Sequence, residues 1–221
     1  MNKQNTLPTI ADLYSDNIEQ VQQIEAYTLL LNKPPKGSWV KEHPYIKGYR
    51  YLPIDKVEYL LRCIFKQYKI EVTGQGTSFN GVFVTVRVHY VHPVTGEWLY
   101  HDGIGAAQLQ TAKGKSPADL ASINNGALSM AFPLAKTVAI KDACDHFGDL
   151  FGANLNRRDT IAYTADASIM QAVVMDWAEI AELFELKKDM IPANEYPNIL
   201  RIIETKETTS KQKLIKYLQA L

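Results

Sequence analysis

The hydrophobic pattern of this chain changes its period within forty residues, and this change limits the folds open to it. Residues 55–68 place their apolar side chains on one helical face, which predicts a helix with Asp55 as its N-cap. Residues 82–90 alternate apolar and polar side chains, which predicts a half-buried strand. Turn residues at 92–96 lead into residues 97–105, the expected second strand of a hairpin.

Other segments add a third strand and several helices. Residues 70–74 are an expected strand, and residues 17–31 have helical spacing. Ser116 stands before a proline, so we expect a helix to begin there and run to about Met130, and Pro133 to kink or restart it before the pattern resumes. Together these elements predict an α+β fold, in which an antiparallel β-hairpin or three-stranded sheet packs on helices.

Loss and return of this periodicity divide the chain into segments. Three short helical patterns near the C-terminus are too few to bury a large core and predict a small helical module. The expected organisation is an N-terminal helical segment at 1–31, an α+β core at 32–155, a linker at 156–168 and a helical C-terminal module at 169–221.

Composition is typical of a globular intracellular protein. Hydrophobic residues make up 46% of the chain, no apolar run approaches the roughly 18–20 residues that cross a bilayer, and the N-terminus lacks signal-peptide features. Cys63 and Cys144 lie in helical patterns without metal-ligand spacing, so we expect reduced, core-facing thiols. We therefore expect a cytoplasmic protein with no membrane partner.

The zero net charge hides a basic region. Residues 32–69 carry nine lysines and arginines against three acidic residues, and within them residues 39–51, WVKEHPYIKGYRY, interleave aromatic and basic side chains. A surface for single-stranded nucleic acid needs this mixture, because cations hold phosphates while aromatic faces accept unstacked bases. The alternative, that these aromatic residues pack the loop onto the core, stays open.

Signatures for other chemistries are weak. A P-loop would need glycine at position 109, where leucine stands, and no GxSxG nucleophile motif occurs. Acidic and histidine residues near the end of the helical pattern that resumes after Pro133 are of the types that form the metal site of a nuclease or hydrolase. These residues are Asp142, Asp145, His146 and Asp149, joined in space by His101 and Asp102 of the hairpin, and the alternative is the polar face of a packed helix.

Three segments follow the order found in a known family. GYRYLPIDKVEYLLRCIF resembles the aromatic-then-helix opening of the Rad fifty-two superfamily of single-strand DNA annealing proteins. VFVTVRVHYVHPVTGEWLYHDGIGAA resembles the family's β-hairpin, and AIKDACDHFGDLFG is similar to its Lys-Arg-Ala-x-x-x-Phe-Gly-x-x-x-Gly helix. The resemblance covers about residues 45–155, and recombinases of phages and mobile elements are the most similar members.

This resemblance implies an oligomeric ring or filament that binds single-stranded DNA by its backbone, with the bases outward, and anneals complementary strands in recombination and repair. It implies no ATP, cofactor or covalent catalysis. Lys141 matches the family's groove lysine and Tyr51 its aromatic residue before the first helix, whereas Asp142 stands at a position usually held by arginine. The expected DNA-binding residues are Lys141, Lys136, Tyr51, Arg50, Lys47, Tyr45, Arg87, Arg157 and Arg158.

The C-terminal module carries an acidic first helix, DWAEIAELFEL, and a lysine-bearing last one, KQKLIKYLQAL. The resemblance implies that such a tail recruits the single-strand binding protein of a bacterial host or a phage exonuclease, and a capping bundle is the alternative. For the whole chain, two other hypotheses stay open: a metal-dependent nuclease or hydrolase, and a protein-interaction module without affinity for nucleic acid.

Overall fold

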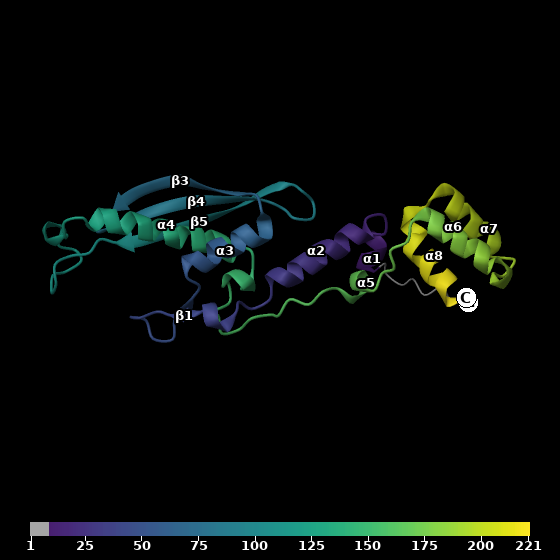
Figure 1. Cartoon of the computed structure of the whole chain (residues 1–221), viewed down its shortest axis with the longest axis horizontal. Coiled ribbons are helices and arrows are strands. Elements are labelled where there is room, and N and C mark those ends of the chain that lie inside the picture. The colour runs from purple at the N-terminus through teal and green to yellow at the C-terminus, as the bar shows by residue number, and fades with distance from the viewer. Residues whose placement is uncertain (1–8) are drawn as a thin grey trace. The chain divides into compact units, whose positions relative to one another are not determined.

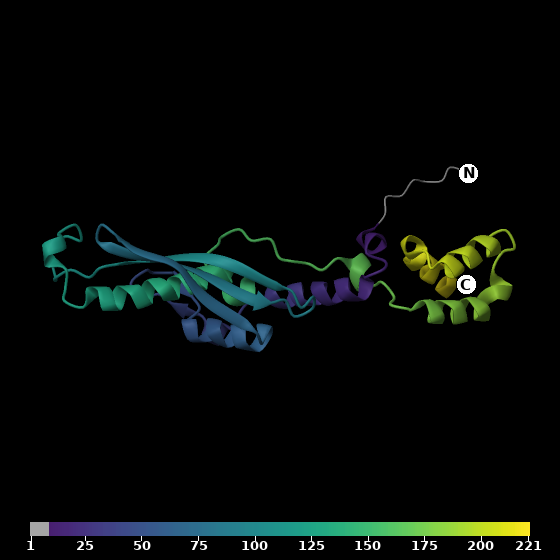
Figure 2. The same ribbon diagram turned by 90° about the horizontal axis from the view of Figure 1, so that it is seen from above.

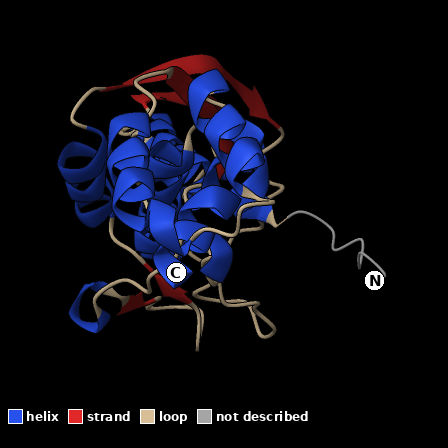
Figure 3. Ribbon diagram, turned by 90° about the vertical axis from the view of Figure 1, so that its right-hand side faces the viewer, coloured by secondary structure: helices blue, strands red, loops and turns tan. Residues whose placement is uncertain are grey.

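The computed structural model describes residues 9–221, which combine helices and strands (Figure 3). The chain forms two compact units. We call Leu30–Ala162 the core unit, and we call the chain up to Leu29 together with Tyr163–Leu221 the terminal unit. This grouping joins the N-terminal helical segment to the C-terminal helices, which the sequence treats as separate segments.

A three-stranded antiparallel sheet is the centre of the core unit and confirms the predicted α+β class and hairpin. Its strands are β3 (Tyr68–Ser78), β4 (Gly81–Val91) and β5 (Trp98–Gln108), in the order β3-β4-β5 (Figures 1 and 2). Every second residue of β4 from Val82 to Tyr90 is buried, as the alternation predicts. A smaller two-stranded sheet joins β1 (Lys41–Glu42) to β2 (Arg50–Tyr51).

Two helices bury the apolar face of the sheet. α4 (Ala127–Asp145) runs along β4 and β5, and α3 (Ile54–Phe65) lies beside α4 (Figure 1). The ring of Phe65 packs against those of Tyr90 and Phe147, at centroid distances of 4.7 and 4.5 Å. The core of this unit is therefore built from α3, α4 and the inward-facing residues of β4.

Two local predictions about the helices were wrong. α3 begins after Pro53, and Asp55 lies in the first turn, where it pairs with Lys56 and interacts with the positive end of the helix instead of capping it. Cys144 is buried as expected, but Cys63 is exposed, because it lies off the apolar stripe of α3.

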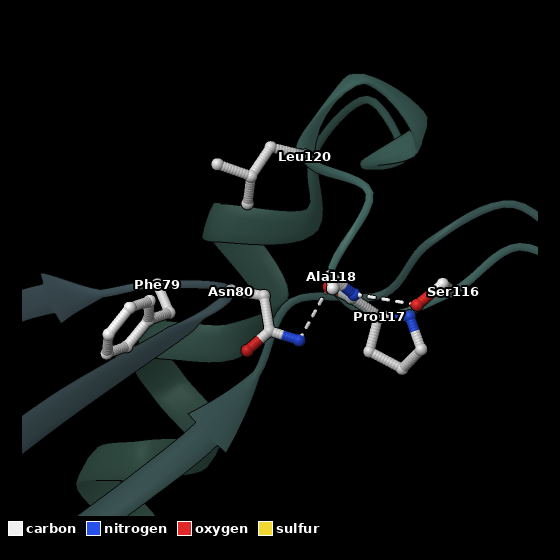
Figure 4. A pocket seen from close by; sticks show the side chains of 6 residues that line it. All are labelled: Phe79, Asn80, Ser116, Pro117, Ala118 and Leu120. Carbon is white, nitrogen blue, oxygen red and sulfur yellow. Dashed lines mark hydrogen bonds between the residues drawn. The ribbon is translucent and has the colours of Figure 1, made fainter.

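The predicted helix start at Ser116 was also wrong. The Ser116 hydroxyl accepts a hydrogen bond from the Ala118 amide, and the Asn80 side chain donates to the Pro117 carbonyl (Figure 4). These bonds hold the segment as a turn beside the β3-β4 hairpin, and only a short 3-10 helix forms, at Leu120–Ser122. α4 begins at Ala127 and continues through Pro133 without restarting.

Glycines of β5 explain how closely α4 lies on the sheet. A Cβ atom at Gly105 would lie 2.1 Å from the Ala135 carbonyl oxygen, and one at Gly103 would lie 2.3 Å from that of Ala139. The helix meets these glycines with alanines at every fourth position: Ala127, Ala131, Ala135, Ala139 and Ala143, all buried. The segment 101–105 of β5, HDGIG, is thus a site of close packing between helix and strand.

The terminal unit is helical. Its elements are α1 (Ile10–Leu13), α2 (Ile18–Leu31, which crosses the boundary at Leu29), α5 (Ala167–Met170), α6 (Trp177–Lys187), α7 (Tyr196–Thr205) and α8 (Thr208–Ala220). The last three confirm the predicted C-terminal helices and share an apolar core that includes Ile180, Phe184 and Ile215. Glu25 of α2 accepts hydrogen bonds from the Tyr163 hydroxyl and the Asp166 amide, which fastens the chain entering α5. None of the helices in residues 9–221 has the length and apolar character to cross a membrane.

Candidate functional site

The basic, aromatic segment predicted to bind nucleic acid forms a small β-ribbon, which comprises β1, β2 and the loop between them. Gly48 turns the loop with a φ of 79°, and its amide donates to the Glu42 carboxylate at 2.8 Å. The amide of His43 donates to the Tyr49 carbonyl at 2.7 Å. These bonds fix the ribbon, residues 41–51, as a defined arm of the core unit.

His43 organises the aromatic side chains of the ribbon. Its ring lies 6.1 Å from that of Tyr45, 6.0 Å from that of Tyr49 and 6.2 Å from that of Tyr51. Tyr45 is 91% exposed, whereas Tyr51 is half-buried. The tyrosines therefore contact one another through His43, and their outer surfaces remain available for a ligand. Trp39 does not join them, since its ring packs on Tyr59.

A cleft of about 690 Å³ separates the ribbon from α4. Lys141 lies in this cleft, with its Nζ 5.0 Å from the centre of the Tyr51 ring, a cation–π contact. Burial lowers the pKa of Lys141, and the Asp145 carboxylate opposes that shift. The ribbon and α4 each contribute five of the lining residues. These are His43, Pro44, Ile46, Tyr49 and Tyr51 of the ribbon and Leu134, Val138, Lys141, Asp142 and Asp145 of α4.

A small hollow adjoins this cleft, and a larger one adjoins the small hollow. The small hollow, of about 70 Å³, shares Tyr51, Lys141 and Asp145 with the cleft and adds Arg50 and Asn156. The larger hollow, of about 440 Å³, shares Arg50 and Leu155 with the small hollow and extends past Lys41 to the loop at 34–37. We call the three together the groove. It brings Lys41, Arg50 and Lys141 along one depression of the core unit.

Residues 155–156 hold the ribbon in place. The Arg50 amide donates to the Asn156 side-chain oxygen at 2.8 Å, and the Asn156 side-chain nitrogen donates to the Arg50 carbonyl at 2.7 Å. The Arg50 guanidinium donates to the Leu155 carbonyl at 2.7 Å. Sequence analysis missed Asn156, because it lies in a segment without periodicity and offers no local signal of this pairing.

Acidic residues balance the cations of the groove. Asp142 accepts a hydrogen bond from the Ile104 amide at 3.0 Å, so this acid completes the outer edge of β5. Burial and the neighbouring Asp142 carboxylate raise the pKa of Asp145 to about 6, against the lowering effect of Lys141. The charged residues lining the groove are Lys41, Arg50, Lys141, Glu42, Asp142 and Asp145, three of each sign.

The structure brings together some of the predicted site residues and separates others. Lys141, Tyr51 and Arg50 line the groove, and Lys47 and Tyr45 lie on the exposed loop of the same ribbon. Arg157 lies near enough to lower the pKa of Asp145, and Arg158 is exposed beside it.

Two predicted residues lie away from the groove. Lys136 is exposed on α4, and at about 100° per residue it lies on the side of the helix opposite Leu134 and Val138. Arg87 lies on the open face of the sheet, where its guanidinium donates to both carboxylate oxygens of Asp102 at 2.7 and 2.8 Å. Neither residue lines the groove.

The predicted acid and histidine cluster does not converge on one point. Asp102 is occupied by Arg87, and Asp142 by the edge of β5. His146 instead packs against His101, with ring centroids 5.4 Å apart, and burial together with His146 lowers the pKa of His101. Within residues 9–221, no three His, Cys, Asp or Glu side chains form a group that could hold a metal ion.

Searches against protein-family models and curated proteins find no match to this chain.

Proposed function

We propose that this protein binds single-stranded DNA in the groove and anneals complementary strands without ATP, as an oligomer. The supporting observation is the convergence of Lys141 from α4 with Arg50 and Tyr51 from the ribbon, which are far apart in sequence and line one depression. The resemblance of residues 45–155 to the Rad fifty-two superfamily agrees with this convergence, since it matches Lys141 and Tyr51 to groove residues.

The contents of the groove suit an unpaired polynucleotide. Lysine and arginine contact phosphates, and base stacking on exposed aromatic rings contributes about 1–3 kcal/mol per base. Annealing requires a surface that aligns two strands, and it needs no nucleophile or bound metal. Because the lining carries three acids beside its three cations, one protomer binds weakly, and repetition of the groove in an oligomer would supply the affinity.

The test is a pair of lysine variants on one helix. Lys141→Ala should weaken binding of a fluorescent single strand and lower the slope of log affinity against log salt by about 0.7, the effect of one phosphate contact. Lys136→Ala removes the same charge from the opposite side of α4 and should leave both quantities unchanged. No binding at low salt, or equal losses in both variants, would contradict the proposal.

Annealing and assembly are measured separately. The wild-type protein should accelerate pairing of complementary oligonucleotides in the absence of nucleotide, and electron microscopy of that mixture should reveal rings or filaments. A monomer that does not accelerate pairing would rule out this function. As part of the same proposal, the protein acts in the cytoplasm of a bacterial cell.

The C-terminal helices suggest a role in recruitment. α6–α8 have their own apolar core, and Leu186 and Met190 remain exposed at the end of α6 and just after it. We propose that this surface binds a host single-strand binding protein or a phage exonuclease. Leu186→Glu should abolish co-purification with that partner while leaving DNA affinity intact, whereas a capping bundle would show neither partner binding nor any effect of the substitution.

A further inference from the structure

The cleft between the ribbon and α4 is suited to a different part of the DNA from the rest of the groove. We propose that it accepts an unstacked nucleobase and favours bases that carry an exocyclic amino group. This inference rests on the proposed function. It assigns the cleft to a base, whereas the resemblance implies contact with the DNA backbone and bases that face outward.

The walls of the cleft favour a base over a phosphate. They are formed mainly by apolar and aromatic side chains, and the cleft's volume of about 690 Å³ lies within the range of small-molecule sites in proteins. A phosphate gains nothing from apolar walls and loses its hydration, whereas a base gains from burial of its apolar faces against them. The wall residues are Pro44, Ile46, Tyr49, Tyr51, Leu134 and Val138.

Two carboxylates give the cleft its chemical preference. Asp142 uses Oδ2 to accept from the Ile104 amide, but its Oδ1 and the Asp145 carboxylate have no hydrogen-bond donor among residues 9–221. An ionised carboxylate only accepts hydrogen bonds. Adenine, cytosine and guanine offer an exocyclic amino group to such acceptors, whereas thymine offers only its N3–H, which lies between two carbonyl oxygens that repel a carboxylate.

Lys141 and Arg50 complete the arrangement at the end of the cleft. Lys141 lines both the cleft and the adjoining small hollow, in which Arg50 also lies. A base between the ribbon and α4 would therefore leave its own phosphate beside these two cations. Asp142 and Asp145 lower the affinity of the groove for a bare phosphate backbone. In this arrangement they instead accept hydrogen bonds from the edge of the base.

The experiment compares oligonucleotides that differ by one chemical group. The probes are a labelled oligo-deoxyadenosine and the same strand with purine replacing every adenine, which keeps both rings and lacks the amino group. Binding to the full-length protein is measured by fluorescence anisotropy at pH 7.5 and constant salt. We expect the purine strand to bind about tenfold more weakly, the effect of about one hydrogen bond per site.

Variants and an abasic strand separate this contact from phosphate binding. Asp145→Ala should bring the ratio between the two strands close to one while tightening binding of an abasic strand, because it removes a negative charge beside Lys141. Asp102→Ala, which removes an acid from the open face of the sheet, should leave the ratio unchanged. Equal affinities of the wild-type protein for the adenine and purine strands would overturn the base preference and leave the proposed function standing. No affinity for any strand would overturn both.

Discussion

The packing of α4 on β5 leads to the sharpest prediction about stability. Gly105→Ala adds a single methyl group, but that carbon would lie 2.1 Å from the Ala135 carbonyl oxygen and 2.4 Å from the Ala139 amide nitrogen. Ordinary contacts between heavy atoms lie near 3.5–4.0 Å. Both obstructing atoms belong to helix backbone, so no change of rotamer can relieve the overlap, and α4 must move away from the sheet.

We expect Gly105→Ala to destabilise the core unit by about 3 kcal/mol, the upper part of the usual range for overpacking. Two other glycines provide controls. Gly76→Ala meets only the ring of Phe83, an exposed side chain that can rotate, and should cost less than about 1 kcal/mol. Gly37→Ala meets no atom within 4 Å and should change stability by less than about 0.5 kcal/mol.

Urea denaturation followed by tryptophan fluorescence measures these changes. In a Trp177→Phe background the remaining tryptophans, Trp39 and Trp98, both belong to the core unit, so the signal reports that unit alone. The displaced helix should also weaken single-strand binding, because it carries Lys141. If Gly105→Ala unfolds at the same urea concentration as Gly37→Ala, the packing of α4 against β5 does not require glycine at position 105, and this reasoning is refuted.

Three further predictions concern charge and anchoring. Since burial and Asp142 raise the pKa of Asp145 to about 6, binding of an abasic single strand should tighten as the pH falls from 7.5 to 5.5, because Lys141 loses a neighbouring negative charge. Stability should fall as the pH rises through 6. Asp145→Asn should remove both trends, with no more than about 1 kcal/mol gained at pH 7.5 because the group keeps contact with solvent. Arg87→Met should cost about 1 kcal/mol or less in urea denaturation and leave DNA affinity unchanged, because its ion pair is on the open sheet face. Asn156→Ala should cost about 1 kcal/mol and reduce DNA affinity, since the backbone of the ribbon loses both bonds that seat Arg50; unchanged affinity would show that the ribbon holds its place without them.

Hydrophobic periodicity was enough to predict the sheet and most helices. The alternation from Val82 to Tyr90 and the apolar face of residues 55–68 reflect local geometry, so each can be read from its own segment. The start of α4 could not be read in this way. Ser116 and Pro117 have the composition of a helix start, but the hydrogen bond from Asn80, which is distant in sequence, holds them in a turn.

The groove was only partly predictable for the same reason. Lys141 and Tyr51 were expected there from the resemblance, and residues 39–51 from their alternation of aromatic and basic side chains, but the two strands of the ribbon were not predicted. Asn156 and the apolar wall of α4 become part of the site only through tertiary contacts. The position of Arg87 was not predictable either, because a basic residue on a strand gives no sign that an aspartate on the next strand will pair with it.

Asp142 connects the fold with the electrostatics of the groove. β5 is an edge strand, and the amide of its Ile104 donates to the carboxylate of Asp142 on α4. An arginine at position 142 could only donate hydrogen bonds, so it would leave that amide without this acceptor. An aspartate at this position therefore satisfies the sheet edge but places negative charge beside Lys141. Under the proposed function, the resulting weak contact per protomer is useful: a strand can leave one groove to test a complementary partner while the neighbouring grooves retain it. DNA binding and self-assembly should then rise together over one range of protein concentration, and tight binding by a monomer would refute this link between the edge of β5 and the action of the oligomer.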